Sequence, residues 1–231
     1  MYGQATPPAY RIHTPRLVLR CWDPRDAPLL KEAIDASLEH LLPWMPWARE
    51  EPQSVDMKVE LLRQFRGRFD LDKDWVYGLF TRDEQAVVGG AGLHPVSSAT
   101  PSTRRHERGV REIGYWVASA FAGQGFATEA ASALVRVGFE LDRAERIEIH
   151  CELDNVRSAA VARKLGFHED GVLRDRLQRG DGELAPKQIF SMFASEYAES
   201  PCSRARCAAF DALGRTSLEL PDEQRRGSGF R

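Results

Sequence analysis

Long hydrophobic runs are absent from this 231-residue sequence. A helix needs about 20 consecutive apolar residues to cross a bilayer, and no segment approaches that length. The first ten residues also lack the basic start and apolar run of a secretory signal. Hydrophobic residues still make up 42% of the chain, enough for one domain with a full core. We expect a cytoplasmic protein without membrane contact, either a monomer or a homodimer.

The sequence also contains few cysteines and has a net charge close to zero. The four cysteines (Cys21, Cys151, Cys202 and Cys207) show neither CxxC nor other metal-ligand spacing, so we expect no disulfide and no metal site. The formal charge of −2 gives no basic field of the kind that nucleic-acid binding requires. A basic cluster within residues 104–111 is interpreted as a solvated loop, with contact to a phosphate or an acidic partner as the alternative.

The most informative stretch is a glycine-bracketed turn between a strand-like run, residues 112–117, and a helix-like run ending near Leu141. Glycines lack Cβ, so backbone N–H groups can approach a phosphate closely. The first turn of the helix adds unpaired N–H groups and the positive end of the helix dipole. The pattern predicts a site for a phosphate-bearing ligand. The predicted site comprises Gly123, Gln124, Gly125, Phe126, Ala127 and Thr128.

Three kinds of phosphate site fit such a turn. A P-loop requires Gly-Lys-Ser/Thr, and Phe126 after Gly125 excludes it. A dinucleotide fingerprint is a near match, but Thr128 stands where Gly or Ala belongs, and five residues separate the strand from the first glycine. The third kind binds the pyrophosphate of coenzyme A.

Residues 112–117, 123–130 and 155–167 form three motifs in a fixed order. Together they resemble the GNAT acyltransferase superfamily, and most of all its Rim-type ribosomal-protein N-terminal acetyltransferases, from about Arg16 to about Glu196. The resemblance implies acetyl-CoA as co-substrate, with its pantetheine arm along the backbone of Trp116, Val117 and Ala118. One departure is Ala122, at a position where the superfamily often has Arg or Gln.

Amine acetylation needs a group to take the proton of the amine and a group to stabilise the leaving thiolate. The resemblance makes Glu112 the base, acting through water and beside the acceptor, with an ion pair to Arg111 or Arg20 as the structural alternative. Ser158 resembles the family's donor to the coenzyme A thiolate, and we prefer it to Tyr115 for that role.

Asn155 is a favourable residue for starting the following helix, and the resemblance gives it a bond to the pantetheine arm as well. The same resemblance places Trp44 and Trp47, on a proline-rich segment, at the border of the acceptor site. The alternative is that the two tryptophans cap the core. Three histidines outside any motif (His94, His150 and His168) are interpreted as structural.

The patterns predict the order strand, helices, three strands, helix, strand, helix, two strands. This is an α+β domain with a mixed, mostly antiparallel sheet flanked by helices, as in the GNAT fold. We place the domain at residues 1–198. Residues 199–231 are interpreted as a polar, partly disordered C-terminal tail with a short helix over residues 208–213.

The predicted function is transfer of acetyl from acetyl-CoA to a primary amine by direct attack in a ternary complex. The Rim-type branch suggests a protein N-terminus as the acceptor. A small-molecule amine, such as an antibiotic or a polyamine, is one alternative, and a non-catalytic regulatory module that binds acetyl-CoA is another.

Overall fold

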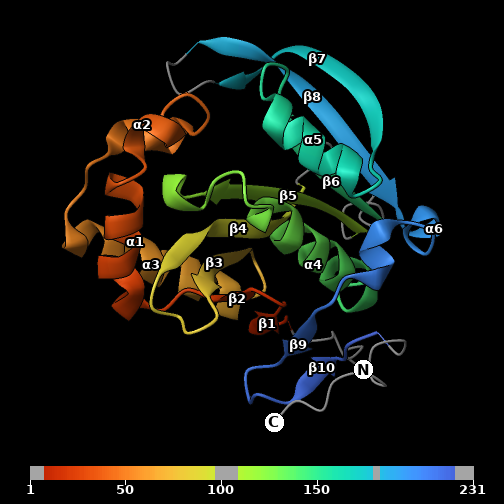
Figure 1. The fold of residues 1–231 in the computed structure, drawn as a ribbon, viewed down its shortest axis with the longest axis horizontal. Coiled ribbons are helices and arrows are strands. Elements are labelled where there is room, and N and C mark those ends of the chain that lie inside the picture. Colours follow the sequence, from red (N-terminus) through yellow and green to blue (C-terminus); the bar gives the residue numbers. More distant parts are fainter. Residues whose placement is uncertain (1–7, 97–108, 179–182, 222–231) are drawn as a thin grey trace.

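The computed structural model describes residues 8–96, 109–178 and 183–221, and within these ranges it forms one ten-stranded sheet with helices on both faces (Figure 1). The strand order is β10-β9-β1-β2-β3-β4-β5-β6-β8-β7. Only the pairing of β5 with β6 is parallel among the described strands. The predicted α+β fold with a mixed, mostly antiparallel sheet is confirmed.

The strands are β1 (Arg11–His13), β2 (Leu17–Cys21), β3 (Trp75–Thr81), β4 (Val87–Pro95), β5 (Val110–Val117), β6 (Arg146–Glu152), β7 (His168–Gln178), β8 (Leu184–Phe193), β9 (Ala208–Phe210) and β10 (Thr216–Leu218). The α-helices are α1 (Ala27–Asp35), α2 (Leu38–Leu41), α3 (Val55–Asp70), α4 (Phe126–Glu140), α5 (Val156–Lys164) and α6 (Ala194–Tyr197). A 3-10 helix, η2, covers Pro46–Glu50.

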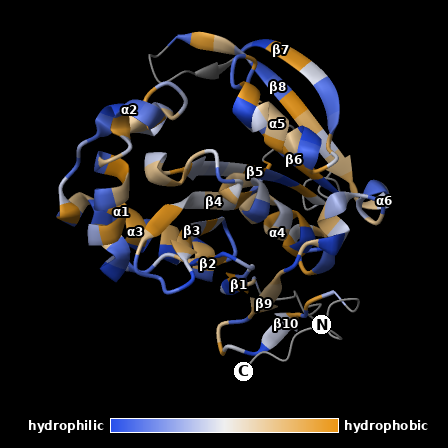
Figure 2. Ribbon diagram, in the orientation of Figure 1, coloured by the Kyte–Doolittle hydropathy of each residue, from blue (hydrophilic) through white to orange (hydrophobic). Residues whose placement is uncertain are grey.

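Alternation along the strands produces two hydrophobic layers, one on each face of the sheet. In β2, Leu17 and Leu19 belong to the cluster that contains α4, whereas Val18 belongs to the cluster that contains α1. Leu79 and Phe80 divide between the same two clusters in β3. Helices α1 and α4 each carry apolar and polar residues (Figure 2), as expected for helices with one buried face.

The parallel strands β5 and β6 pair over only part of their length. Their register runs from Val110 opposite Arg146 to Glu112 opposite Glu148 and then ends, although β5 continues to Val117. On its other side β5 stays paired with β4 as far as Val117. One edge of the second half of β5 therefore has no partner strand in the described chain, and this opening positions the candidate site.

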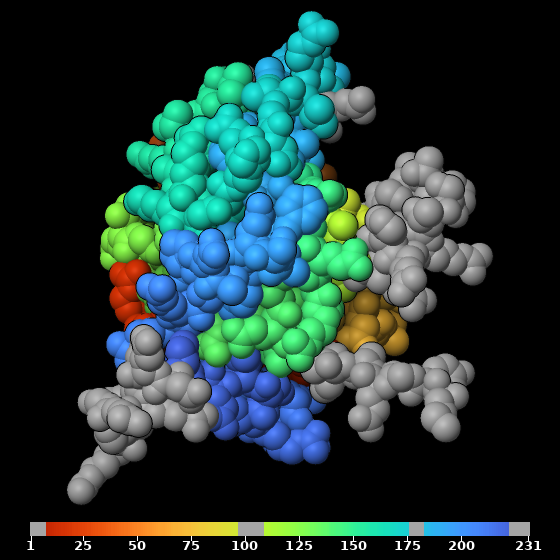
Figure 3. Space-filling model, turned by 90° about the vertical axis from the view of Figure 1, so that its right-hand side faces the viewer, coloured from red at the N-terminus to blue at the C-terminus, as the bar shows by residue number. Residues whose placement is uncertain are grey.

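The C-terminal segment packs against the rest of the domain. Figure 3 shows this segment as the dark blue region beside the green of α4. Arg136 of α4 is buried and donates hydrogen bonds to the carbonyls of Ala205, Cys207 and Glu219. Strand β9 pairs with β1 and with β10, so strands on both sides of residue 198 belong to one sheet. The helix predicted over residues 208–213 is wrong, because β1 offers an open edge that a strand can use.

The other predicted elements occur in the predicted order. Most of the basic cluster within residues 104–111, interpreted above as a solvated loop, lies outside the described residues. Arg111, the cluster's described arginine, forms an ion pair with Asp142 at 2.7 Å. All four cysteines are buried and unbridged. No helix in the described ranges is long and apolar enough to cross a membrane.

Candidate active site

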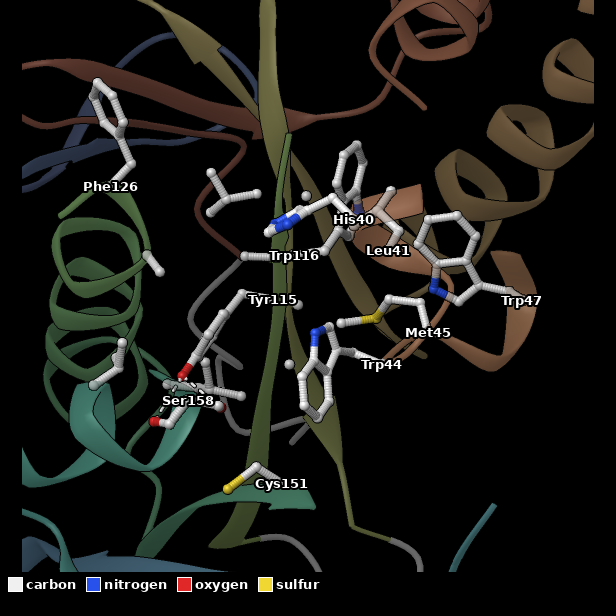
Figure 4. Close-up of a pocket in the computed structure, with 18 of the residues that line it drawn as sticks. His40, Leu41, Trp44, Met45, Trp47, Tyr115, Trp116, Phe126, Cys151 and Ser158 are labelled. Carbon is white, nitrogen blue, oxygen red and sulfur yellow. Dashed lines mark hydrogen bonds between the residues drawn. The ribbon is translucent and has the colours of Figure 1, made fainter. Parts of the chain in front are cut away.

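A cleft of about 990 Å³ opens where β5 and β6 separate, between α4 and α5 on one side and the segment from α2 to η2 on the other (Figure 4). Most of the predicted site residues line it: Trp44, Trp47, Trp116, Val117, Gly123, Gly125, Phe126, Ala127, Thr128, Asn155 and Ser158. Ala118, Gln124 and Glu112 do not line it. Residues far apart in the sequence are thus brought together largely as predicted.

The glycine turn has the backbone geometry that the sequence predicts. Gly123 and Gly125 have φ angles of +75° and +83°, in the left-handed region that favours glycine. Helix α4 begins immediately afterwards, at Phe126, so its unpaired N–H groups lie at the cleft. This arrangement suits a phosphate group.

An arginine that the sequence analysis did not select lies beside this turn. The guanidinium of Arg16 pairs with Glu129 of α4 at 2.6 Å, donates to the carbonyl oxygen of Gln124 at 2.9 Å and stacks 4.3 Å from the ring centre of Phe126. Ala122 lacks the side chain that the superfamily often provides at the turn, whereas Arg16 brings a cation beside Gln124 and Phe126. No local motif joins Arg16 to a turn more than 100 residues away, so tertiary structure alone identifies it.

Ser158 and Tyr115, the two candidates for stabilising the thiolate, lie together rather than apart. Their hydroxyl oxygens are 2.9 Å from each other, between α5 and β5 (Figure 4). Burial raises the pKa of Tyr115, so its phenol stays protonated and can donate. Asn155 accepts a hydrogen bond from the Ser158 N–H at 3.1 Å, which confirms its predicted role as the helix cap.

Glu112 pairs with a histidine and not with an arginine. His150 Nδ1 lies 3.0 Å from Glu112, and its Nε2 lies 2.7 Å from Glu148. Burial would lower the pKa of His150, but the two carboxylates outweigh burial and raise it. Burial would likewise raise the pKa of Glu112, but the contacts with His150 lower it. The alternative of an ion pair with Arg111 or Arg20 is therefore wrong, and the two carboxylates favour the protonated form of His150 beside the cleft.

The proline-rich segment forms the opposite wall of the cleft. The Trp47 ring packs edge-on against Trp116, with ring centres 5.8 Å apart, and remains 36% exposed. Trp44 is half-buried and also lines the cleft. Both tryptophans thus face the cleft and do not fill the core, which disfavours the core-capping alternative.

A second histidine and carboxylate pair lies in the cleft, although the sequence analysis interpreted its histidine, His94, as structural. His94 Nδ1 is 2.6 Å from Asp74 Oδ1, and both residues line the cleft. Trp75 pairs with Leu93 in the sheet, so Asp74 falls beside His94 although the two residues are 20 positions apart. Strand register creates this pair, and no spacing rule in the sequence predicts it.

Comparison with known proteins gives the cleft a context. The model of the acetyltransferase (GNAT) domain family matches residues 16–168, which is more than half of the chain. This chain is a member of the GNAT acetyltransferase family. As a member, it transfers acetyl from acetyl-CoA, its co-substrate, to an amine. The family match decides between the phosphate-site alternatives in favour of coenzyme A.

Two curated relatives and one solved structure show where the chain stands in the family. It is 26% identical to the [ribosomal protein uS5]-alanine N-acetyltransferase of Escherichia coli, over 77% of this chain and 88% of the relative. It is 36% identical to the ribosomal-protein-serine acetyltransferase of the same organism, over 57% and 69%. The structure of Mycobacterium smegmatis RimJ in complex with CoA-disulfide superposes with a TM-score of 0.72 at 25% identity, covering 92% of this chain and 96% of RimJ.

Proposed function

We propose that the acceptor is the N-terminal α-amine of a protein, and specifically of a ribosomal protein. The observation that carries the proposal is the match to two curated relatives whose names specify ribosomal-protein substrates and most of whose length this chain covers. Such an acceptor is made in the cytoplasm, so the proposal includes cytoplasmic residence.

The form of the cleft supports a peptide end as the acceptor. Its walls combine aromatic surface, from Trp44 and Trp47, with carboxylates at Asp74 and Glu152. Apolar walls suit the first side chains of a peptide, and acidic groups attract a cationic amine.

We further propose how acetyl-CoA is held. The backbone of Trp116 to Ala118 binds the pantetheine arm along the open edge of β5, as an added strand would. The turn from Gly123 to Thr128 binds the pyrophosphate, and Asn155 contacts the arm. Ser158 stabilises the thiolate that leaves, with Tyr115 supporting its hydroxyl group. Transfer is by direct attack of the amine within a ternary complex.

The test measures release of free coenzyme A thiol from acetyl-CoA with a matched panel of amines. The panel contains peptides that begin with Ala or Ser. Each is paired with a version of the same peptide that is blocked at the N-terminus and offers only an internal Lys as amine. A polyamine and an aminoglycoside complete the panel. We expect thiol release with the free N-terminal peptides and mass spectra that place acetyl on the α-amine. Turnover of the small amines alone would refute the proposal, and binding of acetyl-CoA without turnover of any acceptor would favour a regulatory module.

A further inference from the structure

We propose that His94, oriented by Asp74, is the base that accepts the proton of the attacking amine. The inference rests on acetyl transfer to an amine and is independent of which amine is used. It assigns the role of base to His94, which lies outside the three sequence motifs, and not to Glu112.

His94 is placed over the part of the sheet that would carry the thioester. It stands on β4 opposite Glu112 of β5, and its ring leans along the strand over two glycines that pair with each other, Gly92 and Gly114. A Cβ atom on Gly92 would lie 2.1 Å from His94 Nε2, and one on Gly114 would lie 3.6 Å from it. The ring tip therefore occupies space that two missing side chains leave open, beside the first unpaired residues of β5.

The two ring nitrogens of His94 have different surroundings. Nδ1 faces Asp74, whose other carboxylate oxygen is 3.3 Å from Arg68 of α3. A carboxylate at Nδ1 holds the ring in one orientation and stabilises the imidazolium that forms when Nε2 takes a proton. Nε2 is then the nitrogen on the cleft side, above Gly114, where an amine attacking the thioester would lie.

Two other acid and base candidates, His150 in the cleft and Glu112 behind it, are already engaged with each other. His150 has a carboxylate at each ring nitrogen and is 8% exposed, and the raised pKa favours its protonated form over a free base. Glu112 is paired with His150 and does not line the cleft, and its lowered pKa makes it a weaker base. A base must reach the proton it removes, and His94 meets this requirement better than Glu112.

The proposed step balances as follows. The amine nitrogen bonds to the acetyl carbon, the bond from carbon to sulfur breaks, and the electron pair leaves with sulfur as coenzyme A thiolate. The proton lost by nitrogen moves to His94 Nε2 and later returns to solvent. The thiolate gains its proton from the Ser158 side of the cleft or from water.

The test compares His94→Ala, Asp74→Asn and Glu112→Gln, using whichever amine gives the fastest thiol release with the unaltered protein. The matched control is His168→Ala, because His168 forms a similar pair with Asp170 at 3.2 Å but lies outside the cleft. We expect His94→Ala to lower kcat by about 10²- to 10⁴-fold, the usual contribution of a general base. The dissociation constant of acetyl-CoA, measured by calorimetry, should change less than about twofold, because the coenzyme contacts proposed above do not involve His94.

Two readouts separate a base from a structural residue. Added imidazole should restore part of the activity of His94→Ala but have no effect on Asp74→Asn or on the control. The rise of kcat with pH should disappear in His94→Ala, although the facing groups Asp74, Arg68 and Glu112 are retained. The proposal would be overturned if His94→Ala kept more than a third of the activity, or if only Glu112→Gln removed the pH-dependent rise.

Discussion

Replacing Lys58 tests whether a buried ion pair supports the wall of the cleft that carries Trp44 and Trp47. Lys58 of α3 and Glu51 form an ion pair with side chains only 1% and 2% exposed. Lys58 Nζ also donates to Gln53 Oε1 at 3.2 Å. The two partners of Lys58, Glu51 and Gln53, lie shortly after the end of η2 at Glu50. Lys58 therefore anchors the segment that carries Trp47. Lys58→Met would leave the carboxylate of Glu51 buried without its cation.

The expected loss follows from that burial. Removing one partner of a buried pair costs about 3–5 kcal/mol, a large part of the roughly 5–15 kcal/mol by which domains are stable. Lys31→Met is the matched control, because Lys31 pairs with Asp35 one helical turn away at 28% and 38% exposure. Such exposed pairs contribute about 0.3–0.5 kcal/mol. We therefore expect about a tenfold difference in free-energy cost between the two lysine substitutions.

Equilibrium urea denaturation at pH 7 measures both losses. The double variant Glu51→Gln with Lys58→Met should be more stable than Lys58→Met alone, because it no longer buries an unpaired charge. In Lys58→Met the acceptor KM should rise while the dissociation constant of acetyl-CoA stays unchanged, since only the wall with Trp47 loosens. A loss no larger than that of Lys31→Met would refute this reasoning.

Three further predictions concern the coenzyme side of the cleft and its charge. Gly125→Ala should weaken acetyl-CoA binding in calorimetry and destabilise the fold by about 1–2 kcal/mol, because a side chain is strained at φ +83°; Gly214→Ala, at φ +75° but away from the cleft, should destabilise similarly without affecting binding. Ser158→Ala should slow single-turnover chemistry and leave acetyl-CoA affinity near normal, whereas weaker binding with unchanged kcat would make it a binding residue. The raised pKa of His150 means that its stabilising contribution is complete below the ordinary value of 6.5 and disappears as pH rises through the higher folded value; NMR titration of His150, with a His150→Gln comparison of stability against pH, should show this, and a value at or below 6.5 would contradict it.

Local sequence determined most of the elements and the glycine turn at residues 123–125. Strand β6 alternates the apolar residues Ile147, Ile149 and Cys151 with polar residues, so its pattern is visible without the fold. Gly123 and Gly125 adopt φ angles that other residues rarely take, and Asn155 caps its helix through its own side chain. Each of these features depends on neighbours within a few residues, which is why the sequence predicted them.

Long-range pairing decided the remainder. Strands β9 and β10 are three residues each, too short to show alternation, and they form because β1 and Arg136 supply partners from distant parts of the chain. Strand register, and not sequence spacing, placed His94 beside Asp74 and His150 between Glu112 and Glu148. The sequence alone therefore identified the family, through three motifs in order, and the glycine turn, because local backbone geometry encodes that turn. Only the tertiary structure decided which acids and bases meet in the cleft, because those contacts depend on how separate strands align.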